Sequence, residues 1–167
     1  IIFGVFFVQN VVSLHPRFTG KDIYYSVRDF KSQELLKNWG IDSELVSDPV
    51  FGITIPNNEQ HGVGVQLRSF PNLTSEFLQG LAKQIALVFP QKQIHLISLQ
   101  DSIDIPVLKN FQKLLAEQNI KSEIISSLSV DNAIERISKL KYLISMRFHA
   151  CLVGTMAGVK VLGINYD

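Results

Sequence analysis

The sequence is poor in cysteine and has no long apolar run. Cys151 is the single cysteine among 167 residues, which excludes a disulfide-stapled secreted scaffold and fits a reducing compartment. The apolar segment of residues 1–8, interrupted by Gly4, falls far short of the ~20 residues that span a bilayer. We therefore expect no transmembrane segment, at most a peripheral membrane association, and a cytoplasmic location.

An excess of charge of one sign is also missing. The chain carries 16 basic and 15 acidic residues, a formal net charge of +1, with no basic cluster. Nucleic acid is therefore not an expected partner. His15, His61 and His95 lack metal-ligand spacing, and neither a phosphate loop nor a Gly-x-Ser-x-Gly elbow is present. We expect no metal and no bound cofactor.

Short β-branched runs alternate with amphipathic stretches, and this pattern indicates an α/β fold. Strands are predicted at residues 23–27, 44–46, 62–67, 93–99, 121–125, 142–145 and 160–164. The intervening helices are predicted at 76–89, capped by Thr74 or Ser75, at 107–118, with Pro106 in the first turn, and from a Ser129 cap to about 139. Strict alternation requires parallel strands joined by right-handed crossovers. The prediction is an open, doubly wound, Rossmann-like parallel sheet with helices on both faces.

Residues 48–61 interrupt this rhythm with two prolines, two adjacent asparagines and a glycine. We interpret them as a linker between the end of an N-terminal lobe, residues 1–47, and a C-terminal lobe, residues 62–167. Residues 1–8 are expected to form a buried strand. We also expect the chain to be a truncated part of a longer protein.

Charged residues that directly follow predicted strands are the candidate site, because open α/β sheets bind ligands beyond the carboxyl ends of their strands. These residues are Arg28, Arg68, Asp101, Arg147 and His149. All but Arg28 fall on one predicted edge. Two arginines beside a helix N-terminus favour a small dianion, since forked guanidinium groups bind carboxylate and phosphate.

Each candidate also has a structural interpretation. His149 enters an apolar helix and could be a core histidine, Asp101 could cap a turn, and Arg147 could be a surface residue. Arg28 and Asp29 could form a structural pair, with Asp29 capping a helix that ends at Gly40.

An ordered set of short motifs resembles the polysaccharide pyruvyl transferase family. It comprises Arg28-Asp29-Phe-Lys-Ser32, Asp48-Pro49, Val65-Gln-Leu-Arg68, Ser145-Met-Arg147-Phe-His149 and Asn165-Tyr166-Asp167, and it covers nearly all of residues 23–167. The resemblance implies a two-lobed, glycosyltransferase-B-like enzyme that transfers the enolpyruvyl carbons of phosphoenolpyruvate to sugar hydroxyls as a pyruvate ketal. The implied acceptor is a sugar or lipid-linked cell-surface polysaccharide. By the same resemblance, Arg147 and His149 fall on the donor site, with His149 catalytic, and Arg68 is a second anion contact.

Two alternatives remain open at this point. A nucleotide-sugar glycosyltransferase shares the architecture, but no acidic residue for a ribose lies between Arg147 and Asp167. A non-catalytic, anion-binding fragment is the other alternative.

Overall fold

A computed structural model describes residues 24–71, 73–127 and 129–165, so the predicted strand at residues 1–8 lies outside the described residues. The chain divides into two compact units, residues 1–53 and 54–167. The first contains β1 (Ser26–Val27), α1 (Phe30–Asn38), β2 (Glu44–Leu45) and the 3-10 helix η3 (Pro49–Gly52). The boundary falls within the segment interpreted as a linker. Its first residues belong to the first unit, because Asp48 forms an ion pair with Arg28.

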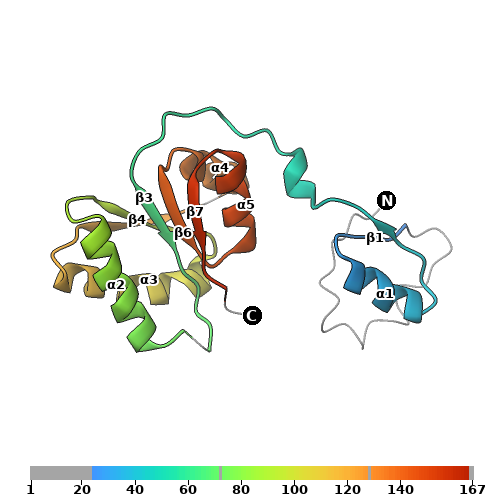
Figure 1. Ribbon diagram of the computed structural model, residues 1–167, viewed down its shortest axis with the longest axis horizontal. Helices are drawn as coiled ribbons and strands as arrows, with labels where there is room; N and C mark the ends of the chain where they lie inside the picture. Colours follow the sequence, from blue (N-terminus) through green and yellow to red (C-terminus); the bar gives the residue numbers. More distant parts are fainter. Residues whose placement is uncertain (1–23, 72, 128, 166–167) are drawn as a thin grey trace. The chain divides into compact units, whose positions relative to one another are not determined.

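The second unit is built on a five-stranded parallel sheet. Its elements are β3 (Val63–Gln66), α2 (Ser75–Val88), β4 (Ile94–Ser98), α3 (Asp101–Glu117), β5 (Ser122–Ser126), α4 (Val130–Ser138), β6 (Tyr142–Ser145), α5 (Phe148–Met156) and β7 (Lys160–Gly163). The strand order is β5-β4-β3-β6-β7, and every neighbouring pair is parallel. Helices α2 and α3 pack together on one side of the sheet, and α4 and α5 on the other (Figure 1). The predicted doubly wound α/β fold is confirmed.

The strand order places a topological switch point between β3 and β6. The chain builds outward from β3 through β4 to β5, then returns through α4 to add β6 on the other side of β3. The two crossovers thus leave the β3–β6 boundary in opposite directions, and open α/β sheets bind their ligands beyond the carboxyl ends of strands at such a point. The fold therefore indicates this edge as the binding edge.

The core is apolar because the central strands are covered on both faces. Val65, Leu96 and Leu67 are fully buried, and α2 and α3 contribute Ile85 and Phe111. Burial on both faces explains why these strands read as continuous apolar runs in the sequence. None of the helices in the described ranges has both the length and the hydropathy of a membrane-spanning segment.

Three predicted helix caps are confirmed. The side chains of Asp29, Thr74 and Ser129 each accept a hydrogen bond from the backbone N–H three residues later, at the starts of α1, α2 and α4. Each cap satisfies one of the N–H groups that a helix start leaves without an intrahelical partner.

The predicted start of α3 is wrong by six residues. The helix begins at Asp101 and not at Val107, so Pro106 lies inside it and not in its first turn. Proline has no backbone N–H, so the hydrogen bond from residue 106 to the Ser102 carbonyl is absent. For this reason a proline in a sequence usually indicates the start or the end of a helix. The first turn of the helix is stabilised instead by Asp104, whose buried carboxylate accepts hydrogen bonds from the backbone N–H groups of Leu99 and Gln100, just before the helix. These local hydrogen bonds, together with the ion pair that Asp104 forms with the distant Arg147, thus outweigh the proline.

Candidate functional site

The carboxyl ends of β3 and β6 bring two of the predicted arginines to one edge. Gln66 is in register with Ser145, and Arg68 and Arg147 each lie two residues further along. Asp101 follows the neighbouring strand β4 at the same edge. The topology therefore groups these strand-end residues as the sequence predicts.

Arg147 is held by a carboxylate that the sequence analysis missed. Its Nη2 donates to Oδ1 of Asp104 at 2.8 Å and to Oε1 of Gln100 at 3.3 Å. The Arg147 side chain is 20% exposed, whereas that of Asp104 is fully buried. Asp104 thus balances the positive charge that Arg147 places beside the N-terminus of α5, where a cation alone is unfavourable.

Asp104 accepts hydrogen bonds on both oxygens. Its Oδ2 accepts from the backbone N–H groups of Leu99 and Gln100 at 2.9 and 3.0 Å, and from Nε2 of Gln66 at 3.4 Å. With Arg147 on Oδ1, this gives the buried carboxylate four donors, which offsets the cost of removing its charge from water. The spacing Asp101-x-x-Asp104 directly after a strand is the signal that could have identified it.

Gln66 links the same residues from β3. Its Oε1 accepts from the backbone N–H of Arg147 at 3.0 Å and from the hydroxyl of Ser145 at 3.1 Å. Its Nε2 donates to the Leu67 carbonyl and to Asp104. Because an N–H can only donate, the amide oxygen must face Arg147, and this fixes the orientation of the side chain. A glutamine within an apolar strand was a second signal for this buried network.

Asp101 has a different environment from Asp104. It is the first residue of α3 and is exposed, and its oxygens accept from the hydroxyls of Ser98 at 2.6 Å and Ser126 at 2.7 Å. Hydrogen bonds from Ser126 and then Ser98 hold the pKa of the Asp101 carboxyl below its usual value, because they favour its charged form. Asp101 therefore joins the ends of β4 and β5 and still offers a carboxylate to solvent.

We expect Ser126→Ala to raise the pKa of Asp101 toward its ordinary value, because the substitution removes the largest cause of the shift. A carboxyl ¹³C NMR titration measures this directly. Ser122→Ala, at the other end of β5, is the matched control. An unchanged Asp101 titration in Ser126→Ala would show that the hydroxyl does not stabilise the carboxylate.

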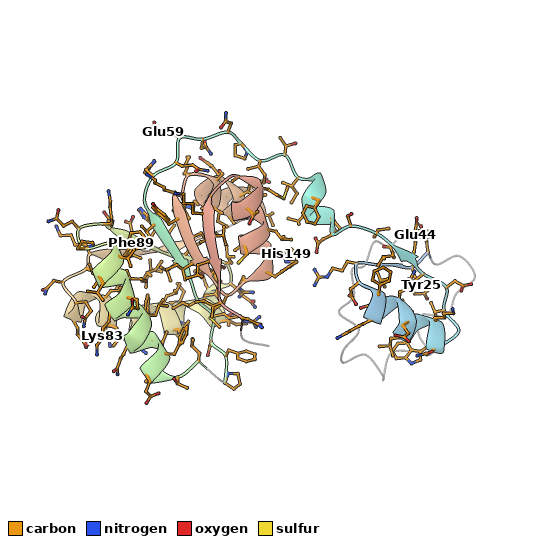
Figure 2. The ribbon with its side chains drawn as sticks, in the orientation of Figure 1. Tyr25, Glu44, Glu59, Lys83, Phe89 and His149 are labelled. Atoms are coloured by element: carbon orange, nitrogen blue, oxygen red, sulfur yellow. The ribbon has the colours of Figure 1, made fainter. Side chains whose placement is uncertain are left out.

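His149 is the second residue of α5, and its side chain is exposed (Figure 2). The ring of Phe148 meets it edge-on, with centroids 5.6 Å apart. The alternative that His149 is a core histidine is therefore wrong. Its position in the first turn places it among backbone N–H groups and the positive end of the helix dipole, an environment that suits an anionic ligand.

The two remaining candidates, Arg68 and Arg28, are not part of the hydrogen-bonded network around Asp104 described above. Arg68 is partly buried just beyond Leu67. Arg28 lies in the first unit, where its Nη1 is 2.5 Å from Oδ2 of Asp48, while Asp29 caps α1. The predicted cap is thus confirmed for Asp29, and Arg28 forms an ion pair with Asp48. Hydrogen bonds from Ser32 and, after them, the charge of Arg28 lower the pKa of Asp29. A substrate-binding role for Arg28 stays a prediction.

Neither a cysteine nucleophile nor a metal site is supported by the residues described at this edge. Cys151 is half-buried, and burial raises the pKa of its thiol, so it is a weak nucleophile. Within the part of the chain that the structure describes, no three His, Cys, Asp or Glu side chains cluster as metal ligands do. The site is thus built from arginine, histidine, carboxylates and backbone N–H groups.

Comparison with protein-family models gives one match, the polysaccharide pyruvyl transferase family, over residues 14–167. The chain belongs to this family. The match spans both units and every candidate residue, and it favours a pyruvyl transferase over a nucleotide-sugar glycosyltransferase. A comparison with curated proteins finds no significant match. Family membership makes the chain a transferase-family protein and implies a polysaccharide acceptor.

Proposed function

We propose that this pyruvyl transferase uses phosphoenolpyruvate as its donor and forms a pyruvate ketal on sugar hydroxyls of a cell-surface polysaccharide. The observation that carries the proposal is the placement of Arg147 and exposed His149 at the start of α5, on the switch-point edge of the sheet. This arrangement sets a cation, a proton-transfer group and a helix N-terminus side by side. A cytoplasmic location follows from the proposal, because phosphoenolpyruvate is a cytoplasmic metabolite.

The donor suits the charges at this edge. Phosphoenolpyruvate carries a carboxylate and a phosphate on adjoining atoms. Arg147 uses Nη2 for Asp104 and Gln100, so its other terminal nitrogen, Nη1, is the one proposed to contact the donor. Arg68, from β3, is proposed as the second anion contact, and the first turn of α5 adds backbone N–H groups. Exposed Asp101 is proposed to accept a hydrogen bond from the acceptor sugar.

The reaction needs no oxidant or reductant. A proton adds to the methylene carbon of phosphoenolpyruvate, and a sugar hydroxyl captures the cationic carbon that results. Phosphate then leaves with its bridging oxygen, and a second hydroxyl of the acceptor closes the ketal. The two sugar hydroxyls release two protons. One makes up for the proton added to the methylene carbon, and the other protonates the departing phosphate.

His149 is proposed to transfer these protons, because imidazole can donate and accept near neutral pH. In the proposed complex the donor phosphate lies at the start of α5, beside His149. We expect His149 to deliver the proton to the methylene carbon in this complex. The alternative role is a hydrogen bond to the phosphate without proton transfer.

We expect the chain to bind phosphoenolpyruvate in preference to a nucleotide diphosphate sugar, and Arg147→Lys to weaken that binding. Lysine retains the charge but loses the planar fork, at a cost of roughly 1.5–3 kcal/mol per lost charge-assisted bond. Titration calorimetry with both ligands provides the measurement. Tight binding of the nucleotide sugar, with none of phosphoenolpyruvate, would falsify the proposed donor, and unchanged affinity in Arg147→Lys would remove Arg147 from the site.

A further inference from the structure

Arg147 is fixed at its main chain and at its side chain by two different buried residues. Gln66, which is 1% exposed, accepts a hydrogen bond from the backbone N–H of Arg147. Asp104, which is fully buried, accepts one from Nη2 of the same arginine. The Nε atom of Arg147 is itself buried. An arginine on a surface samples many rotamers, whereas this one is ordered before any ligand arrives.

Order of this kind matters most for a ligand with two charged groups. A single anion can be followed by a moving guanidinium, but a carboxylate and a phosphate at a fixed separation need the cation at one place. Immobilising a free side chain on binding lowers affinity by about two- to tenfold, and a side chain that is already ordered avoids this loss.

We propose that Asp104 is a positioning residue that holds Arg147 in the orientation that selects phosphoenolpyruvate over inorganic phosphate. This inference rests on the proposed function. Asp104 influences a ligand through Arg147, because its own carboxylate is fully buried and does not reach the ligand. Gln66 supports the same arrangement from the main-chain side.

Asp104→Asn separates the hold on Arg147 from the anchoring of α3. An asparagine amide has one oxygen, and the N–H groups of Leu99 and Gln100 both require an acceptor. The oxygen therefore turns toward these two donors, and the NH₂ group faces the guanidinium. The turn before α3 keeps its bonds, while Arg147 loses its ion pair.

Loss of the Asp104 charge and loss of order change ligand selection in opposite directions. Removing a negative charge favours both anions, and it favours phosphoenolpyruvate more because its carboxylate adds to the charge of its phosphate. Releasing Arg147 disfavours phosphoenolpyruvate, the ligand that needs the fixed cation. The ratio of the two dissociation constants, phosphate over phosphoenolpyruvate, therefore rises for a charge effect and falls for a positioning effect.

The test is calorimetric titration of the full chain and its variants with phosphoenolpyruvate and with inorganic phosphate. We expect Asp104→Asn to lower the ratio by about two- to tenfold. Asp131→Asn is the charge-matched control, since it removes one negative charge from the first turn of α4 without touching Arg147, and it is expected not to lower the ratio. In an Arg147→Gln background, Asp104→Asn should lower the ratio no further, because its effect passes through Arg147.

A ratio that is unchanged or raised in Asp104→Asn overturns the proposal, as does a further fall in the Arg147→Gln background. Hydrogen exchange of the Arg147 Nε–H, followed by ¹⁵N NMR, tests the hold on the guanidinium without a ligand. Exchange should be slow in the parent and fast in Asp104→Asn. A parent that does not prefer phosphoenolpyruvate overturns the proposed function, whereas equal exchange in parent and variant overturns the positioning role separately.

Discussion

His149→Gln is expected to lower the rate of phosphate release from phosphoenolpyruvate, at saturating donor and acceptor, by about 10²- to 10⁴-fold. The reason is that glutamine offers a hydrogen bond but cannot transfer a proton. Because the His149 side chain is exposed, its replacement opens no cavity in the core, and thermal stability should stay close to that of the parent. Phosphate release in the presence of acceptor and a melting curve measure the two quantities.

The distribution of this loss identifies the role of His149. A proton-transfer group affects the rate at saturating donor, whereas a group that only binds phosphate raises the donor concentration required. His61→Gln is the control, since His61 is also exposed but lies before the amino end of β3, at the opposite edge of the sheet. If His149→Gln retains the parent rate and only its donor KM rises, His149 is a binding residue and another group supplies the proton.

Asp104→Ala should have the largest effect on stability, a loss of about 3–5 kcal/mol in the free energy of unfolding. The substitution leaves Arg147 without its buried partner and removes the acceptor of the Leu99 and Gln100 N–H groups. It also removes the anchor that offsets Pro106 inside α3. Urea denaturation of the full chain, monitored by circular dichroism, measures the change.

Glu135→Ala is the comparison for this experiment. It also breaks a carboxylate ion pair, with Lys139, the residue that caps the carboxyl end of α4, but both side chains are exposed and the two residues are only four positions apart. Exposed pairs of this kind contribute little, so its denaturation curve should nearly coincide with that of the parent. If Asp104→Ala unfolds at the same urea concentration as Glu135→Ala, the buried network does not stabilise the edge of the sheet.

Several features of the site were predictable because they are local. Parallel strands place every strand-end residue at one edge, so the positions of Arg68, Asp101 and Arg147 followed from the alternation of strands and helices. Capping depends on residues three apart, which is why the Asp29 and Ser129 caps were predicted correctly. The motif order also indicated the family to which the chain belongs.

Contacts between distant residues were not predictable in this way. The Gln66 to Arg147 bond joins residues 81 positions apart, and the Asp104 to Arg147 bond spans 43. The sequence around Gln66 and Asp104 does not indicate that the fold will place Arg147 beside both of them.

The sequence by itself determined the fold class and the residues that stand at the binding edge, because hydrophobic periodicity and capping act over a few residues at a time. Only the tertiary structure decided that Arg147 is ordered by a buried carboxylate, that His149 is exposed, and that α3 begins before Pro106. The physical reason is that burial and charge pairing depend on which segments pack together. A buried carboxylate such as Asp104 is stable only where the completed fold supplies its donors.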